Sequence, residues 1–393
     1  MKRLFVVISA LALCFGASAQ VLEDFVPSEL NQPGQEYPMV NSQGYARFRI
    51  NAPKAESVVV SLGLGGRGGT VLKKGEDGMW WGTTEGPLDE GFHYYHLTID
   101  GGVFNDPGTE NYYGSTRWES GIEIPAKDKD FYAMKNVPHG KVSQVWFWSE
   151  STQQFRRAFV YTPPTYDPAQ KKVNYPVLYL QHGWGENEYA WWNQGHANLI
   201  IDNLIAEKKI EPFIVVMTYG MTNEARRGPA PAARPAAPAA APGAARPAAP
   251  AARPVAAGPR MDNGFQTVLC DELVPYIDTN FKTKADRAHR AMAGLSMGGM
   301  ETHSITLARP EMFAYFGLLS GGVYTPDELK DMKDVKGIFV GCGSKESGDR
   351  TLKAAEDLKA AGYNAKGYVS PGTAHEFLTW RRCLLEMAPM LFK

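Results

Sequence analysis

A serine flanked by glycines at the end of a short apolar run is the first residue whose surroundings indicate chemistry. The segment Gly294-Leu295-Ser296-Met297-Gly298 follows Ala291-Met292-Ala293, and a helical pattern begins at Gly299. A strand that turns sharply into a helix holds the serine in a strained backbone conformation, so the residues two positions away must be small. The pattern therefore predicts that Ser296 is a nucleophile at the end of a strand.

A serine hydroxyl needs a base, and His375 lies where one is expected. It follows the strand-like run Tyr368-Val369-Ser370 and a turn, and it precedes a helical pattern at 377–385. The chain order serine, acid, histidine is one of those in which such triads occur. His289 precedes the strand that leads to the serine, and His303 lies in the helix that follows it, so neither reaches the hydroxyl easily. We therefore predict that His375 is the general base.

The carboxylate that orients the histidine is expected after the apolar run 337–340, and two candidates occur there. Glu346 is closer to the end of the strand, where rigid placement is easier. Asp349 has the position of a cap at the start of a helix over 350–361. The sequence favours Glu346 as the third member of the triad and leaves Asp349 as the alternative.

Backbone N–H groups must stabilise the negative charge that develops on the substrate oxygen. One is expected from Met297, the residue after the nucleophile, and one from the loop in Gln181-His182-Gly183-Trp184-Gly185. The flanking glycines allow the Trp184 amide to turn toward the site, so Trp184 and Met297 are the predicted oxyanion-hole donors. His182 is interpreted as a brace of this loop and not as a catalyst.

The elements that must position these residues alternate between buried strands and helices. From about Val145 onward, apolar runs are each followed by loop residues, as in parallel strands that are buried on both faces. These runs cover 175–180, 212–217, 291–293, 313–319 and 337–340. With helical patterns between them, the alternation predicts an α/β fold with a doubly wound sheet, whose sites form at the carboxyl ends of the strands.

The preceding part of the chain has a different pattern. From about residue 45 to 124, short alternating runs are separated by Gly, Asp, Asn and Pro clusters, which predicts an antiparallel β-sandwich. Trp80 and Trp81 are adjacent, as are Tyr94 and Tyr95, so one ring of each pair is expected in the core and the other at the surface. Aromatic faces that remain exposed would suit stacking on sugars. The alternative is that these rings only pack the sandwich, and the sequence leaves both open.

Three motifs of this stretch are Phe48-Arg49-Ile50-Asn51-Ala52-Pro53, Asp77-Gly78-Met79-Trp80-Trp81, and Tyr94-Tyr95 followed by Asn105-Asp106-Pro107. By these motifs the stretch resembles the family 48 carbohydrate-binding modules and related early-set immunoglobulin-like domains. The resemblance covers about residues 38–112. It implies an immunoglobulin-like β-sandwich domain over 20–125 and says little about glycan binding, because many such domains are spacers or neighbours of an active site.

Four motifs stand out in the later part of the chain: His182-Gly183-Trp184-Gly185, Gly294-Leu295-Ser296-Met297-Gly298-Gly299, Cys342-Gly343-Ser344-Lys345-Glu346 and His375-Glu376-Phe377 with Trp380-Arg381. With these motifs the later part resembles the esterase D group of α/β-hydrolases, and within it carbohydrate esterase family 1, the feruloyl and acetyl-xylan esterases. The similarity covers about residues 130–393 and implies an α/β-hydrolase domain over 126–393. It implies Ser296 as nucleophile, His375 as base and Glu346 as acid, where many relatives carry Asp.

The resemblance implies a secreted serine carboxylesterase that removes feruloyl (hydroxycinnamoyl) esters from plant arabinoxylan or a feruloylated oligosaccharide through an acyl-enzyme. No metal or organic cofactor is implied. The alternatives are an acetyl-xylan esterase, an enterochelin-type trilactone siderophore esterase and a non-catalytic glycan-binding protein. Flat rings suit an aromatic acyl group, and the substrate-binding candidates are Trp192, Tyr219 and Trp380, with Trp184 and Trp191 as further possibilities.

A segment of unusual composition, residues 228–259, interrupts the α/β pattern. It holds sixteen Ala and nine Pro, and its only charges are Arg234, Arg246 and Arg253. It lacks the apolar side chains that form a core, and proline at this frequency excludes a helix. We expect an extended or disordered insert.

The start of the chain has the pattern of a secretory signal. Lys2 and Arg3 precede an apolar run at 4–15, and Ala17-Ser18-Ala19 supplies the small residues that a signal peptidase requires. We expect residues 1–19 to be a signal peptide, so the protein is expected to be periplasmic or extracellular, without a membrane anchor.

Charge and cysteine content limit the remaining possibilities. The chain has 41 basic and 42 acidic residues, so no overall field favours nucleic acid. Beyond Cys14, it contains Cys270, Cys342 and Cys383, which allow at most one bridge and are expected to be buried free thiols.

Overall fold

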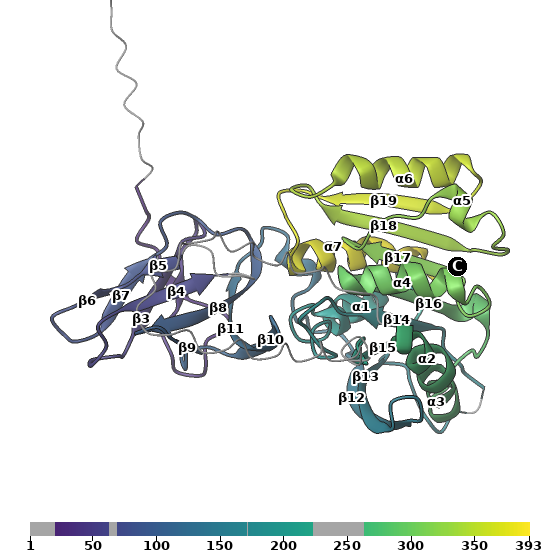
Figure 1. Ribbon diagram of the computed structural model, residues 1–393, viewed down its shortest axis with the longest axis horizontal. Coiled ribbons are helices and arrows are strands. Elements are labelled where there is room, and N and C mark those ends of the chain that lie inside the picture. Colours follow the sequence, from purple (N-terminus) through teal and green to yellow (C-terminus); the bar gives the residue numbers. More distant parts are fainter. Residues whose placement is uncertain (1–19, 63–68, 171, 223–262) are drawn as a thin grey trace, which may run out of the picture.

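The computed structural model describes residues 20–62, 69–170, 172–222 and 263–393, which form two packed parts (Figure 1). The expected signal peptide at 1–19 and the insert at 228–259 lie outside these residues. The first part is built from two antiparallel sheets and the second from a mixed sheet with helices.

The first part is a pair of antiparallel sheets that pack face to face, as the alternating pattern predicts. Its strands are β1 (Val26–Pro27), β2 (Met39–Val40), β3 (Ala46–Ile50), β4 (Val58–Leu62), β5 (Gly69–Val71), β6 (Lys73–Lys74), β7 (Trp80–Thr83), β8 (Gly91–Ile99), β9 (Gly102–Phe104), β10 (Asn111–Gly114) and β11 (Arg117–Ile124). The strand orders are β1-β2-β3-β7-β6 and β10-β11-β8-β4-β5, with β9 paired to β8. Alternate side chains, among them Phe48, Val60 and Tyr95, meet between the sheets and form their core.

The second part contains a mixed sheet in the order β12-β13-β15-β14-β16-β17-β18-β19, counted over the described residues. Its strands are β12 (Lys141–Ser149), β13 (Gln154–Thr162), β14 (Val177–Gln181), β15 (Ile214–Thr218), β16 (Arg290–Leu295), β17 (Tyr315–Leu319), β18 (Gly337–Gly343) and β19 (Ala365–Ser370). The strands from β14 to β19 are parallel, as expected. An antiparallel hairpin, β12 and β13, extends one edge and was not expected.

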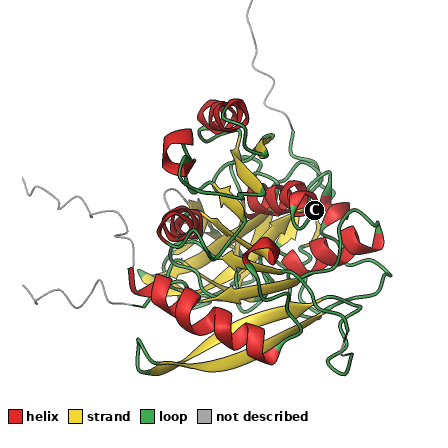
Figure 2. Ribbon diagram, turned by 90° about the vertical axis from the view of Figure 1, so that its right-hand side faces the viewer, coloured by secondary structure: helices red, strands yellow, loops and turns green. Residues whose placement is uncertain are grey.

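Helices cover both faces of this sheet (Figure 2). They are α1 (Ala197–Ala206), α2 (Asn263–Thr267), the π-helical turn η3 (Val268–Leu273), α3 (Val274–Asn280), α4 (Met297–Ala308), α5 (Pro326–Leu329), α6 (Gly348–Ala360) and α7 (Phe377–Met387), with short 3₁₀ turns η1 (Lys129–Phe131), η4 (Arg287–His289) and η5 (Ala388–Met390). One apolar core joins α1 and α7 to the sheet. A second core joins the segment from α2 to α3, α4 and α6 to the opposite face. The α/β domain is therefore doubly wound.

One of the two aromatic pairs departs from the expectation. Trp80 lies in the sandwich core and Trp81 is half-buried against Tyr37, with ring centroids 5.6 Å apart, as predicted. Tyr95 is in the core, but Tyr94 is buried as well, so the predicted surface position of one ring is wrong. The outer face of β8 is covered by the α/β domain, and sequence alternation cannot reveal such a cover.

The two parts are joined by buried polar contacts as well as apolar ones. The Arg381 guanidinium on α7 pairs with the Glu123 carboxylate on β11 at 2.6 Å, and both side chains are almost fully buried. Nearby, Phe92 on β8 packs against Phe377 at a centroid distance of 5.8 Å. The sandwich is thus packed directly against the helix that follows the predicted catalytic histidine.

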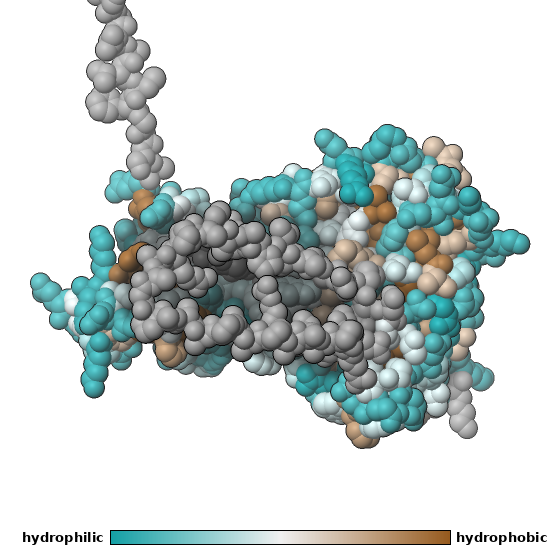
Figure 3. Space-filling model, viewed as in Figure 1, coloured by the Kyte–Doolittle hydropathy of each residue, from teal (hydrophilic) through white to brown (hydrophobic). Residues whose placement is uncertain are grey.

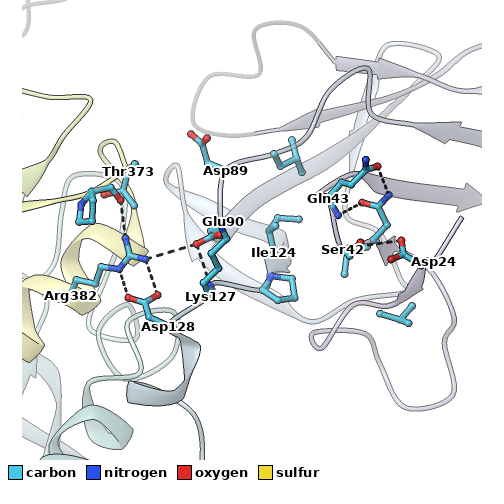
Figure 4. Close-up of a pocket in the computed structure, with 18 residues that line it drawn as sticks. Asp24, Ser42, Gln43, Asp89, Glu90, Ile124, Lys127, Asp128, Thr373 and Arg382 are labelled. Carbon is cyan, nitrogen blue, oxygen red and sulfur yellow. Dashed lines mark hydrogen bonds and ion pairs between the residues drawn. The ribbon is translucent and has the colours of Figure 1, made fainter. Parts of the chain in front are cut away.

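A cleft of about 970 Å³ lies where the two parts meet. Arg382 of α7 projects toward it and pairs with Asp128, while Ser42 and Gln43 line the opposite side (Figure 4). Charged and polar side chains line the cleft together with apolar ones, and it lies beside the loop that precedes His375. On the face shown in Figure 3, the uncovered surface of both parts is mainly hydrophilic, with hydrophobic residues in small groups.

Cysteines, membrane segments and metal sites add few constraints. Cys270, Cys342 and Cys383 are buried and unpaired, as predicted. No helix in the described ranges has the length and apolar character needed to cross a membrane. In the same ranges, no group of three or more His, Cys, Asp or Glu side chains could hold a metal ion.

Candidate active site

Ser296 lies between β16 and α4 in a conformation that few residues other than glycine adopt. Its φ is 51° and its ψ is −113°. A side chain at Gly294 would collide with the backbone of Gly298, and a Cβ at Gly298 would lie 2.6 Å from the His182 carbonyl oxygen. Gly294 is therefore required by the tightness of the turn itself, and Gly298 by the close approach of the turn to the loop after β14.

The predicted base and acid are in contact. His375 Nδ1 lies 2.8 Å from Glu346 Oε1, so this nitrogen donates to the carboxylate and Nε2 is left as the nitrogen that can accept a proton. Glu346 Oε2 accepts further hydrogen bonds from the Gly343 N–H at 2.7 Å and from the Ser320 hydroxyl at 2.8 Å. The carboxylate is thus fixed on both oxygens.

Glu346 is held in its charged form. Burial by itself would raise the pKa of this carboxyl, but the hydrogen bonds from His375, Gly343 and Ser320 lower the pKa below its ordinary value. Asp349 lies in the first turn of α6, and the N-cap position belongs to Ser347, so the predicted capping role of Asp349 is wrong. The structure brings Glu346, and not Asp349, to the histidine.

Ser320 is a site residue that the sequence reasoning missed. It follows β17, donates to Glu346, and accepts a hydrogen bond from Trp380 Nε1 at 3.1 Å. Leu319, the residue before Ser320, accepts a hydrogen bond at its carbonyl from the Ser296 N–H at 2.8 Å. The end of β17 therefore ties the nucleophile turn to the acid loop. The position of Ser320 at the carboxyl end of a parallel strand is the signal that could have identified this residue.

His182 braces the loop after β14, as predicted. It is buried, its Nδ1 lies 2.7 Å from the Gly183 carbonyl oxygen, and its Nε2 accepts from the Gly220 N–H at 3.0 Å. Burial lowers the pKa of His182 to about 4 and keeps the ring neutral. A neutral ring with one donor and one acceptor satisfies both contacts, which join the ends of β14 and β15.

One predicted oxyanion donor directly follows the serine, and the other lies in the loop after the neighbouring strand. Met297 is the first residue of α4, where a helix has N–H groups without intrahelical partners. Trp184 lies between Gly183 and Gly185 in the loop after β14, the strand next to β16. Their roles as donors stay predictions.

The aromatic candidates fall into different environments. Trp380 is buried and lies edge-on to His375, with centroids 5.1 Å apart, and Trp192 packs against Phe159 at 5.3 Å. Trp191 is 1% exposed and donates to the Gln181 carbonyl, so the prediction that it walls a pocket is wrong. Trp184 is exposed. These positions leave Tyr219 and Trp184 as the rings of the set that are best placed to meet a ligand.

A groove of about 480 Å³ lies between the sandwich and the hairpin of β12 and β13. Tyr219 lines it and stacks on His182 at a centroid distance of 5.6 Å. Exposed rings reach it from both parts, from Trp118 on β11 and from Trp146 and Phe155 on the hairpin. Asn187 and Glu188 line it as well, so the groove adjoins the loop after β14 that carries the predicted oxyanion donor.

The mixed sheet, the serine turn and the histidine-carboxylate pair define a serine hydrolase of the α/β type. A family model described as putative esterase matches residues 149–389, and the chain belongs to this family.

The chain is 63% identical over 374 residues to an endo-1,4-β-xylanase/feruloyl esterase from Xylanibacter ruminicola, with 94% of this chain and 48% of that protein covered. It is 26% identical over 239 residues to endo-1,4-β-xylanase Y from Acetivibrio thermocellus, which covers 57% of this chain and 18% of that protein. The chain thus spans about half the length, or less, of these two relatives.

A solved structure of the enterobactin esterase from Shigella flexneri is similar in fold. It covers 88% of this chain and 92% of its own, with a TM-score of 0.59 and 15% sequence identity. This likeness extends over both parts of the molecule and shows the fold alone.

Proposed function

We propose that this protein is a serine carboxylesterase that acts through an acyl-enzyme. The Ser296 oxygen attacks the ester carbonyl carbon while His375 Nε2 takes the hydroxyl proton. The alcohol leaves with that proton, and the acyl group remains on Ser296. Water then attacks the acyl-enzyme, His375 takes the proton from water, and the serine oxygen leaves with that proton as the acid is released. The Trp184 and Met297 N–H groups stabilise the oxyanion in both steps.

Glu346 supports the base during each proton transfer. Its contact with His375 Nδ1 holds the ring in the tautomer that leaves Nε2 free to accept, and its charge stabilises the imidazolium that forms. The lowered pKa of Glu346 keeps this charge in place at neutral pH. The 2.8 Å contact between His375 and Glu346, together with the strained turn at Ser296, is the observation that carries the proposal.

The proposed substrate is a feruloyl ester on plant arabinoxylan. The 63% identical relative is named an endo-1,4-β-xylanase/feruloyl esterase, and the match covers nearly the whole of this chain. The aromatic groove beside the site supports a substrate with flat apolar faces, such as a feruloyl group and the sugars that carry it. The polysaccharide, or a feruloylated oligosaccharide, is the proposed partner.

Three finer expectations belong to the same proposal. The sandwich is proposed to be immunoglobulin-like and related to the family 48 carbohydrate-binding modules, which its two packed antiparallel sheets support. The protein is proposed to be exported to the periplasm or the medium, as the pattern of residues 1–19 suggests. The domain boundary is proposed to lie near residue 125, which the end of β11 at Ile124 and the start of β12 at Lys141 support.

The test is to incubate the purified mature protein with feruloylated, acetylated arabinoxylan and to quantify the ferulate and acetate released. Ferulate release that disappears in Ser296→Ala is expected. Release of acetate alone would change the assignment to an acetyl-xylan esterase. The second candidate, a trilactone esterase, has support from the fold of the enterobactin esterase, and hydrolysis of a trilactone without ferulate release would favour it.

A further inference from the structure

A buried carboxyl that the mechanism does not use lies between the loop after β14 and the sandwich. Glu186 is 5% exposed. Both of its carboxyl oxygens have partners. Glu186 Oε2 accepts a hydrogen bond from the Gly183 N–H at 2.9 Å, and Oε1 lies 3.3 Å from the Tyr94 hydroxyl on β8. One carboxyl therefore joins the predicted oxyanion loop to the sandwich.

The Tyr94 hydroxyl is held in place by further buried contacts. Gln194 Nε2 donates to it at 2.6 Å and to the Tyr113 carbonyl at 3.0 Å. The hydroxyl proton has two acceptors, Glu186 Oε1 and the Tyr113 carbonyl oxygen, both at 3.3 Å. Because unpaired polar groups are costly in a buried site, this network resists a shift of the loop relative to β8 and β10.

A second contact holds the other side of Trp184. The Thr116 N–H, in the turn between β10 and β11, donates to the Gly185 carbonyl at 2.8 Å. Ser115 and Thr116 have φ values of 51° and 66°, as a two-residue type I′ turn requires, although neither is Gly or Asn. Backbone strain of this kind persists where the surroundings impose it, and it often lies at functional sites.

These contacts lie close to the nucleophile. A Cβ placed on Gly183 would be 3.3 Å from Glu186 Oε2 and 3.4 Å from Ser296 Cβ. A displacement of about 1 Å at such a position can cost roughly 10²-fold in rate, and loss of one oxyanion donor costs about 10²- to 10³-fold.

We propose that Glu186, held by Tyr94 of the sandwich, is a positioning residue that fixes the Trp184 N–H for the oxyanion, so that the sandwich is a structural part of the active site. The inference rests on the proposed esterase function. It differs from a role of the sandwich in binding polysaccharide, because it predicts effects on small soluble esters. Glu186 acts through the loop and does not itself touch the substrate.

The test is steady-state kinetics of the full mature chain on methyl ferulate at neutral pH. Glu186→Ala is expected to lower kcat by roughly 10²-fold with little change in KM. Glu186→Gln is expected to stay within about threefold of wild type, because its amide oxygen still accepts from the Gly183 N–H. This rescue separates a positioning contact from a need for charge.

Tyr94→Phe and Tyr95→Phe form a matched pair that tests the sandwich side. The Tyr95 hydroxyl donates to Asp106 Oδ2 at 2.7 Å inside the sandwich, on the opposite face of β8. Tyr94→Phe is expected to lower kcat about 3- to 10-fold, in line with the loss of one hydrogen bond, and Tyr95→Phe to leave kcat unchanged. Melting temperatures of both variants show whether the two losses in stability are similar.

The outcomes separate this inference from the proposed function. Unchanged kcat in Glu186→Ala, or equal kcat in the two tyrosine variants, overturns the inference. If Glu186→Ala fails to fold, the tyrosine pair decides. All variants are also assayed on 4-nitrophenyl acetate: a wild type that is active there and inactive on methyl ferulate contradicts only the proposed substrate, and the comparison of kcat values then uses that ester. A wild type that is inactive on both overturns both proposals.

Discussion

Ser296 combines a strained backbone with an amide that is tied to a neighbouring strand. The N–H donates to the Leu319 carbonyl, so the turn is held at the strand end independently of the side chain. Removal of the hydroxyl should therefore leave the fold intact. Ser296→Ala is expected to lower kcat by several orders of magnitude, on the order of 10⁶ by analogy with other triads. Ester hydrolysis by the variant above a few percent of wild type would contradict the assignment.

The acid of the triad can be tested by a pair of matched substitutions. Glu346→Gln removes the charge that stabilises the His375 imidazolium, and the loss in kcat is expected to approach 10⁴-fold, as in related triads. Asp349→Asn changes a residue in the first turn of α6 and should alter kcat little. The measurement is kcat for both variants on one soluble ester. Similar mild losses in both would mean that another group orients the histidine.

Glu186 also gives stability a dependence on pH. Burial raises the pKa of Glu186 from 4.5 to about 7, so the folded protein holds a proton that the unfolded chain releases at lower pH. The stability that the protonated Glu186 carboxyl contributes is fully present below pH 4.5 and is lost as the pH rises through about 7. Relative to Glu186→Gln, the free energy of unfolding of wild type should fall by about 2 to 3 kcal/mol between pH 5 and pH 8. Urea unfolding of both proteins at the two pH values measures this, and a constant difference would mean that the carboxyl is not buried.

The sequence predicts the proposed triad because its signals are local, and it misses residues whose roles depend on distant partners. The glycines around Ser296 and the position of Glu346 after a strand can be read within a few residues. Glu186 depends on Tyr94, 92 positions away, and no local pattern marks that contact. Ser320 has a role only because β17 lies between β16 and β18.

At the scale of the elements, the turn between β10 and β11 is a site of strain that can be relieved. Thr116 is exposed and has a φ of 66°, which glycine adopts at no steric cost. Thr116→Gly keeps the N–H that donates to Gly185, so the oxyanion loop should keep its support. We expect a gain in stability of about 0.5 to 1 kcal/mol with unchanged kcat. A lower melting temperature would show that the threonine side chain contributes more than the strain costs.

The hairpin of β12 and β13 provides a test of the groove. Trp146 on β12 lines it and is about half exposed, with the Arg157 guanidinium 5.6 Å from the centre of its ring. If sugars of the polysaccharide stack there, Trp146→Ala should raise KM on arabinoxylan about 3- to 10-fold, since an aromatic stacking contact is worth about 0.5 to 1.5 kcal/mol. KM on methyl ferulate is the internal control and should not change. Equal effects on both substrates would show that the ring supports the site and does not bind the polymer.

The architecture of the elements was only partly predictable for a physical reason. Runs that are buried on both faces, such as β14 and β15, stand out in the sequence. The strand β12 has one exposed face and lies at an edge, so its alternating residues do not differ from those of a sandwich strand. The cover over Tyr94 was equally hidden, because a strand pattern does not show which domain packs against its outer face.

At the scale of the whole molecule, a buried ion pair couples the sandwich to the α/β domain. The Arg381 guanidinium on α7 contacts both oxygens of Glu123 on β11, at 2.6 and 3.2 Å, and donates also to the Gln194 carbonyl. Because Arg381 is fully buried, removing the charge of Glu123 would leave an uncompensated cation inside the interface. The two parts are therefore expected to unfold together, and a calorimetric scan should show one transition.

Because one partner of a buried pair is lost, Glu123→Gln should lower the free energy of unfolding by about 3 to 5 kcal/mol. This loss corresponds to a decrease of roughly 6 to 10 °C in melting temperature. The matched control is Glu23→Gln, which removes the carboxylate from an exposed pair: Arg47 contacts both Glu23 oxygens, at 2.8 and 3.0 Å. Exposed pairs contribute little, so no measurable change is expected there. A weakened interface should also separate the single transition of the wild type into two in Glu123→Gln. Equal melting temperatures in the two variants would show that the interface does not hold the sandwich and the α/β domain together through this pair.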